Sequence, residues 1–180
     1  MRCAATMHEI APRSQVLVYE DEGVNMQSSE ALVTQLRALL DSAISIQKVG
    51  SDYLKTQSWE DKTIALVMGG GKCTPWEKSL EESGMHKIRD YVLGGGKYLG
   101  FCAGAYFASA ESHFSSLPKK NRPLAFFKGK AKGPLFDTEN YHVANEWITL
   151  DTLNEHDQRT IFNIEVNVFL NFRVGLGFSY

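Results

Sequence analysis

The sequence predicts a doubly wound α/β fold, in which a mostly parallel sheet lies between helices on both faces. Short apolar runs that end in acidic residues or glycine alternate with amphipathic segments along the first two thirds of the chain. The order strand, helix, strand, loop, strand, helix, strand, helix needs crossover connections, which favour parallel strands. The length of 180 residues and the hydrophobic content of 43% are typical of one globular domain.

The first strand is predicted at residues 16–19, where four apolar residues precede the acidic cluster 20–22. The leucines of the next segment recur at helical spacing, and Ser28 and Ser29 are its candidate N-caps. Apolar and polar residues then alternate over 44–49, which indicates a second strand at the edge of the sheet.

A third, fully buried strand is predicted at residues 63–68, directly before three glycines. Residues 84–93 have one apolar helical face and end at another glycine triplet, which indicates a helix with a glycine C-cap. Residues 97–101 predict a fourth strand, and residues 103–110 predict the helix that follows it.

Beyond residue 114, prolines and glycines divide the chain into short segments, and we expect antiparallel strands to be added to the sheet. Candidate strands are 124–127 and 141–147. Residues 162–172 alternate strictly between apolar and polar side chains, which predicts a half-exposed strand. If the usual final strands are missing, this strand lies at an open sheet edge, which favours a homodimer.

Composition excludes several classes of function. The formal charge of −2 and the isoelectric point near 6.2 disfavour binding to nucleic acid. No 18-residue apolar stretch is present, so we expect no membrane association. Residues 1–14 lack a signal-peptide core and are interpreted as a tail before a domain at 15–180. Three cysteines without disulfide or zinc spacing indicate a cytoplasmic protein with neither metal nor cofactor.

The most informative segment is the Gly-x-Cys-x-Gly motif at residues 100–104, where a strand enters a helix. Glycines on both sides of the central residue permit the tight turn of a nucleophile elbow. A cysteine at a helix N-terminus favours the reactive thiolate form. Cys102 is therefore the candidate nucleophile, and the alternative is a buried cysteine that acts as a small apolar residue.

An attacked carbonyl oxygen needs hydrogen-bond donors. The amide of Ala103 and those of Gly70 and Gly71, at the end of the neighbouring strand, are the candidate donors, and Gly104 lines the same pocket. The glycine clusters lack the spacing of a P-loop or of a dinucleotide fingerprint. The lysines at 128, 130 and 132 are interpreted as the solvent side of an extended segment.

Four segments together carry a family resemblance: 20–23, 67–71, 94–107 and 128–134. They resemble the N-terminal domain of eukaryotic-type biotin protein ligases and its free-standing bacterial relatives, within the class I glutamine amidotransferase-like superfamily. The resemblance implies a flavodoxin-like fold and a cysteine-dependent hydrolase or amidotransferase pocket at Cys102. It does not imply biotinylation, because ligase activity resides in a separate domain for which this chain has no room.

The chain lacks the His-x-Glu motif that completes the catalytic triad of the superfamily. A downstream His followed two residues later by Glu completes that triad, and no such motif is present here. His142 and His156 are candidate bases. His113, eleven residues past Cys102 on the predicted helix, would lie about 16 Å along the axis and too far for proton transfer. The resemblance also suggests that Glu20 hydrogen-bonds the sulfur, although a solvated acidic turn is an equal alternative.

Two functions remain open at this point. In the first, Cys102 attacks an amide or ester carbonyl of a small molecule and forms a thioester. In the second, the domain is a non-catalytic binding or regulatory module that keeps the pocket, and the missing His-x-Glu favours this second function.

Overall fold

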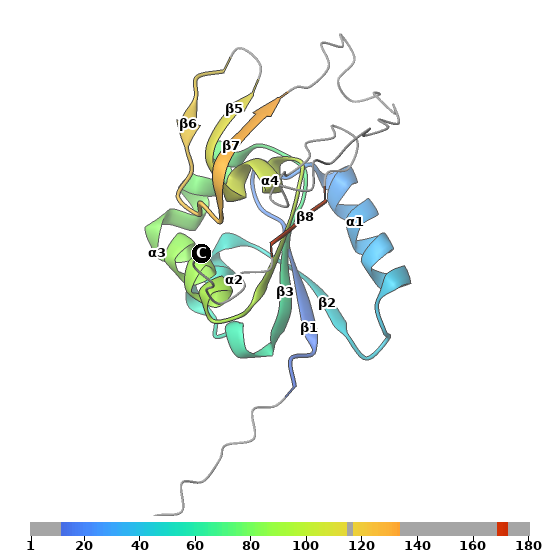
Figure 1. Cartoon of the computed structure of the whole chain (residues 1–180). Coiled ribbons are helices and arrows are strands. Elements are labelled where there is room, and N and C mark those ends of the chain that lie inside the picture. Colours follow the sequence, from blue (N-terminus) through green and yellow to red (C-terminus); the bar gives the residue numbers. More distant parts are fainter. Residues whose placement is uncertain (1–11, 115–116, 134–168, 173–180) are drawn as a thin grey trace, which may run out of the picture.

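The computed structural model describes residues 12–114, 117–133 and 169–172. Its main sheet has five strands in the order β2-β1-β3-β4-β8 (Figure 1). The first four strands are parallel, and β8 is antiparallel to β4 at the edge. The strands are β1 (Gln15–Tyr19), β2 (Ser45–Val49), β3 (Thr63–Met68), β4 (Lys97–Phe101) and β8 (Phe169–Phe172). The predicted α/β class and its parallel sheet are confirmed.

Helices cover both faces of the sheet, as predicted. On one face, Val33 of α1 (Met26–Leu39) packs in a cluster with Val16 and Val67. On the other face, a larger cluster includes Leu66 of β3 and Trp76 of α3. In Figure 1, α1 lies on one side of the sheet and the helices α2 and α3 lie on the other. The helical segments of this second side are α2 (Ser51–Thr56), η1 (Glu60–Lys62), α3 (Cys73–Leu93) and α4 (Ala103–Ala108).

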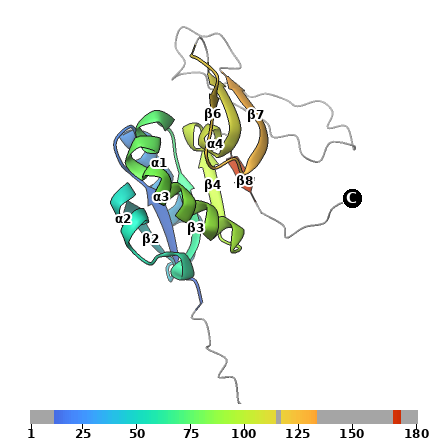
Figure 2. The same cartoon turned by 90° about the vertical axis from the view of Figure 1, so that its left-hand side faces the viewer.

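A second, three-stranded sheet follows α4, and it lies beyond the carboxyl ends of the parallel strands (Figure 2). It consists of β5 (Ser109–Phe114), β6 (Lys120–Asn121) and β7 (Phe127–Gly133), in the order β6-β5-β7. The antiparallel addition expected near the C-terminus is β8 on the main sheet, whereas β5 belongs to the separate sheet and pairs antiparallel with β6 and parallel with β7. The predicted strand 124–127 is wrong, because only Phe127 lies in β7 while Leu124 is buried outside any strand.

Three helix predictions need correction. Asn25, rather than Ser28 or Ser29, caps α1, because its side chain accepts a hydrogen bond from the Ser28 amide. The helix predicted at 84–93 starts at Cys73 and has a kink at Glu81, where φ is 55°. The helix predicted at 103–110 ends at Ala108, because the following residues pair with strands that come later in the chain.

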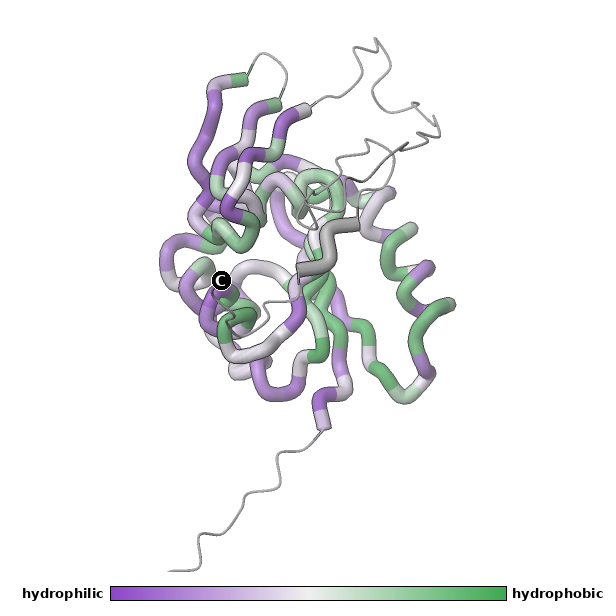
Figure 3. The backbone as a smooth tube through the Cα atoms, in the orientation of Figure 1, coloured by the Kyte–Doolittle hydropathy of each residue, from purple (hydrophilic) through white to green (hydrophobic). Residues whose placement is uncertain are grey.

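The two sheets differ in hydropathy. Hydrophobic residues concentrate in the strands of the main sheet and in α1, whereas β5 to β7 contain many hydrophilic residues (Figure 3). On β7 the exposed residues Lys128, Lys130 and Lys132 alternate with less exposed ones, which confirms the predicted solvent side. Lysine on an edge strand discourages pairing with another chain. No helix in the described ranges has the length and apolarity needed to cross a membrane.

Candidate functional site

Three loops meet at the carboxyl ends of the parallel strands. The loop after β1 is bound to the loop after β3 by hydrogen bonds from Asn25 N to Gly70 O (3.0 Å) and from Lys72 N to Gly23 O (2.8 Å). The third loop is the turn between β4 and α4, and the loop after β3 is bound to the first residues that follow this turn, because Gly104 N donates to Gly69 O at 3.0 Å. Main-chain contacts therefore fix the three loops as one unit around the end of β4.

Cys102 is the residue between β4 and α4, and its side chain is partly exposed. Its backbone angles are φ 49° and ψ −112°. Such angles belong to the first central residue of a type II′ turn, a position that glycine dominates. A residue with a β-carbon held there carries strain of about 1–3 kcal/mol, which proteins retain mainly at functional sites. Because α4 has only six residues, the helix dipole predicted at this thiol is small.

The two glycines of the motif are required by close backbone contacts. A β-carbon on Gly104 would lie 2.1 Å from Met68 O, and one on Gly100 would lie 2.6 Å from Gly104 O. The buried hydroxyl of Tyr98 also donates to Gly104 O at 2.8 Å. The motif therefore permits β4, α4 and the end of β3 to approach one another, and this places Cys102 beside the glycine loop.

The glycine loop has two distinct positions. Gly70 lies beside Cys102, since a β-carbon placed on it would lie 3.9 Å from Cys102 Cβ. Gly71 has a φ of 151°, and a β-carbon there would lie 2.2 Å from Gly23 O. Gly70 is thus beside Cys102, whereas Gly71 permits the contact between the loops after β1 and β3.

Glu20 contacts Ser29 and Lys48 in the structure. Its carboxylate accepts a hydrogen bond from Ser29 Oγ at 2.6 Å and pairs with Lys48 at 2.9 Å, on the side of β2. Burial opposes ionisation, but Ser29 and Lys48 outweigh it and lower the pKa of Glu20. These contacts connect α1 to the sheet, and a hydrogen bond from Glu20 to the sulfur of Cys102 stays a prediction.

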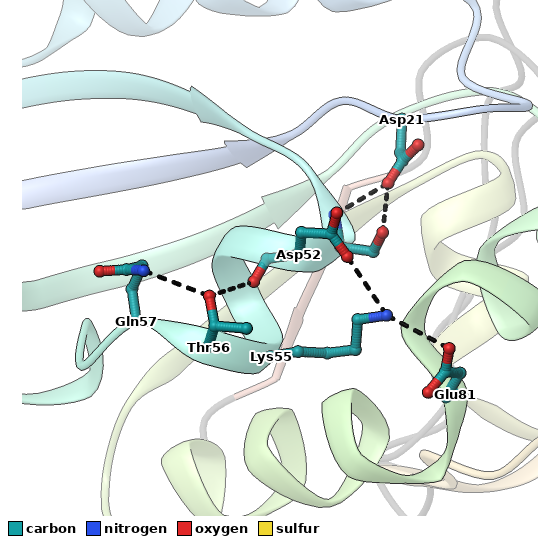
Figure 4. A network of polar contacts seen from close by, with 7 residues as sticks. Asp21, Asp52, Lys55, Thr56, Gln57 and Glu81 are labelled. Carbon is teal, nitrogen blue, oxygen red and sulfur yellow. Dashed lines mark hydrogen bonds and ion pairs between the residues drawn. The ribbon is translucent and has the colours of Figure 1, made fainter.

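Asp21 also has a structural role. It accepts hydrogen bonds from Ser51 N at 2.8 Å and Ser51 Oγ at 2.5 Å, at the start of α2 (Figure 4). In the same network Lys55 pairs with Asp52 and Glu81, both at 3.3 Å. Burial opposes ionisation of Asp21, but the bonds from Ser51 lower its pKa. An acidic side chain from a distant loop therefore caps α2, which explains why the local sequence did not predict this helix.

Cys73, to which the sequence assigned no role, lies next to the site. Its thiol donates to the carbonyl oxygen of Ala103 at 3.3 Å. Burial raises the pKa of Cys73 to about 11, and the nearby Arg122 opposes this shift only in part. The position of Cys73, two residues after Gly71, was the signal that could have placed it here.

Cys73 is expected to be almost inert to alkylation at neutral pH. Raising the pKa of its thiol from 9.0 to about 11 leaves about a hundredfold less thiolate than an unperturbed thiol has at pH 8. Its alkylation rate should therefore keep rising about tenfold per pH unit up to pH 11. Site-resolved mass spectrometry with iodoacetamide measures this rate, and labelling at pH 8 as fast as in the urea-unfolded chain would contradict the prediction.

The candidate base His142 lies outside the described residues, as does His156. His113 is on β5 and not on the helix of Cys102, so the expected separation along a helix axis was wrong. His86 is on the exposed side of α3, 3.7 Å from Glu82. In the ranges that the structure describes, no three metal-ligating side chains gather into a group that could hold a metal ion.

Replacing Cys102 by glycine is expected to stabilise the fold by about 1 kcal/mol. Glycine removes backbone strain of about 1–3 kcal/mol at this φ but costs about 0.5–1 kcal/mol of chain entropy. Urea unfolding followed by tryptophan fluorescence measures the change. Cys102→Ser keeps a β-carbon and is the control, with a stability close to that of the original chain. Destabilisation by the glycine variant would show that the turn is unstrained.

Comparison with known proteins gives two similar sequences and one family. The chain is 34% identical over 148 residues to an uncharacterised protein of Chlamydia muridarum, covering 79% of this chain and 57% of that one. It is also 34% identical over 135 residues to the biotin–protein ligase of Schizosaccharomyces pombe, covering 70% of this chain but only 21% of the ligase. No solved structure matches the chain.

The family model described as "Biotin-protein ligase, N terminal" matches residues 14–171. This range includes every strand and helix of the described structure except the last residue of β8. It also contains all four segments on which the sequence resemblance was based. The chain therefore belongs to the biotin-protein ligase N-terminal family.

Proposed function

We propose that this protein acts on small amides or esters through Cys102, as an amidotransferase-like member of its family. The observation that carries the proposal is the backbone of Cys102, with φ 49° and ψ −112° at a partly exposed thiol. Flanking glycines and three joined loops hold this conformation. A nucleophile elbow has the same parts, namely a strand, a strained turn and a helix.

In the proposed reaction the thiolate of Cys102 attacks the carbonyl carbon and forms a C–S bond. The C–N or C–O bond of the substrate then breaks, and the amine or alcohol leaves with a proton. Water attacks the thioester, releases a carboxylic acid and restores the thiol. His142 is the proposed proton acceptor for the thiol.

Main-chain amides near Cys102 are the proposed donors to the negative oxygen of the intermediate. Two of the first amides of α4 donate to carbonyl oxygens of the protein. Gly104 N donates to Gly69 O and Ala105 N donates to Cys102 O, both at 3.0 Å. The amide of Ala103 precedes both, and we assign it to the oxyanion together with the amides of Gly70 and Gly71.

We further propose that the chain has no biotin ligase activity of its own. Its family match is to the N-terminal part of such ligases, and it spans 21% of the length of the yeast enzyme. Incubation with biotin, ATP and an acceptor protein, followed by streptavidin detection, should therefore give no signal. A biotinylated acceptor would contradict this part of the proposal.

The thiol chemistry is tested with p-nitrophenyl acetate and iodoacetamide. We expect an acylation burst that Cys102→Ser reduces by at least about a hundredfold, while Cys73→Ser leaves it intact. Iodoacetamide should alkylate Cys102 at least about tenfold faster in the folded protein than in the urea-unfolded chain. Equal rates in the two states, without a burst, would instead indicate the non-catalytic binding module.

A further inference from the structure

Ser28, in the first turn of α1, lies close to Gly70, as does Cys102. A β-carbon placed on Gly70 would be 3.1 Å from Ser28 Oγ and 3.9 Å from Cys102 Cβ. The two atoms are therefore within about 7 Å of each other, the total of these distances, and both lie close to the same point above Gly70. The side chains of Ser28 and Cys102 thus both approach this point.

The position of Ser28 is fixed by the loop that it faces. Its amide donates to Asn25 Oδ1 at 2.9 Å, and Asn25 N donates to Gly70 O at 3.0 Å. The next residue, Ser29, is held to Glu20 at 2.6 Å. The first turn of α1 is therefore bound both to Gly70 and to the end of β1, so the backbone of Ser28 keeps its place relative to Cys102.

The hydroxyl of Ser28 is not used by the fold. Serine at the start of a helix usually caps it, but Asn25 supplies the cap of α1. Ser28 is exposed, and Oγ has no hydrogen-bond partner among the residues that the structure describes. A hydroxyl can both donate and accept, so it is available to a molecule bound over Gly70.

We propose that Ser28 contacts the substrate of the Cys102 site, through a hydrogen bond from its hydroxyl to a small carboxamide held over Gly70. This inference rests on the proposed function and names its substrate class. A carboxamide offers both a donor and an acceptor, so it can pair with a hydroxyl that does the same.

Two alkylating reagents test the proposal. With either reagent the thiolate of Cys102 displaces iodide, so an S–C bond forms and a C–I bond breaks. Iodoacetamide carries a carboxamide, whereas methyl iodide has no hydrogen-bonding group. Ser28→Ala should slow alkylation of Cys102 by iodoacetamide about threefold to tenfold, the value of one hydrogen bond, and change the rate with methyl iodide less than about twofold. Ser28→Thr, which keeps the hydroxyl, should restore most of the iodoacetamide rate.

The ratio of the two rates separates the outcomes. If Ser28→Ala slows alkylation by both reagents equally, Ser28 only supports the structure and the proposal is overturned. If it slows neither reaction, the proposal is overturned as well. The urea midpoint of each variant checks that the chain is folded. If Cys102 of the original chain reacts no faster than in the unfolded state, the proposed function fails, whereas a reactive Cys102 with a constant ratio removes only the role of Ser28.

Discussion

Gly70→Ala is expected to slow acylation of Cys102 by about a hundredfold while the chain stays folded. The added methyl group would occupy the point that lies 3.1 Å from Ser28 Oγ and 3.9 Å from Cys102 Cβ. A substrate carbonyl that is displaced by even about 1 Å from the attacking atom can lose this much rate. The burst with p-nitrophenyl acetate measures the effect.

The fold should tolerate this alanine. Positive φ among the described glycines occurs at Gly23, Gly71 and Gly95, so Gly70 has a backbone that alanine can adopt. Its tightest new contact is the end of the Ser28 side chain, which can rotate away. Such a substitution changes stability by about 1 kcal/mol or less.

Gly69→Ala is the matched control for Gly70→Ala. A β-carbon on Gly69 would meet only Leu32 Cδ2, at an ordinary distance of 3.5 Å, on the face covered by α1. It should leave the burst unchanged within about twofold. Normal acylation in the Gly70 variant, or an equal loss in both variants, would show that the space above Gly70 is not the route to the thiol.

Gly104→Ala is expected to destabilise the fold by about 3 kcal/mol or more. Its β-carbon would lie 2.1 Å from Met68 O and 2.8 Å from Met68 C, so backbone must move. Overpacking usually costs about 1–3 kcal/mol, and a clash with a rigid strand end lies at the upper limit of that range or above it. The movement also breaks the 3.0 Å bond from Gly104 N to Gly69 O.

Urea unfolding followed by the fluorescence of the buried Trp59 and Trp76 measures this loss of stability. Gly69→Ala again serves as the control, with a change of less than about 1 kcal/mol, because its new contact is ordinary. An unfolding free energy for Gly104→Ala within about 1 kcal/mol of the original would show that α4 can move away from β3 at low cost.

Several elements were predictable because their signal is local. The apolar runs of β1 and β3 and the strand before Cys102 were predicted at or within a residue of the observed ends. The terminal strand predicted at 162–172 contains β8, which pairs with β4 at the edge of the sheet, and a dimer through that edge stays a prediction. A buried strand shows itself in sequence because nearly all of its residues are apolar.

Other elements were missed because their partners are distant in the chain. Residues 109–114 were predicted to begin as helix, but they pair with strands that follow them by several residues or more. The helix α2 depends on Asp21, which lies 30 residues before its first residue. Local sequence patterns contain no information about such contacts. Pairing with distant strands therefore overrode the local helix propensity.

The sequence by itself determined the α/β class, the family and the turn at Cys102, because apolar period and glycine spacing are properties of neighbouring residues. Only the tertiary structure decided what surrounds that thiol. It placed Ser28 near Gly70 and Cys73 against Ala103, and it bound Glu20 to Lys48 of β2. Those neighbours come from separate loops, and the hydrogen bonds that bring the loops together form only when the strands are aligned in one sheet.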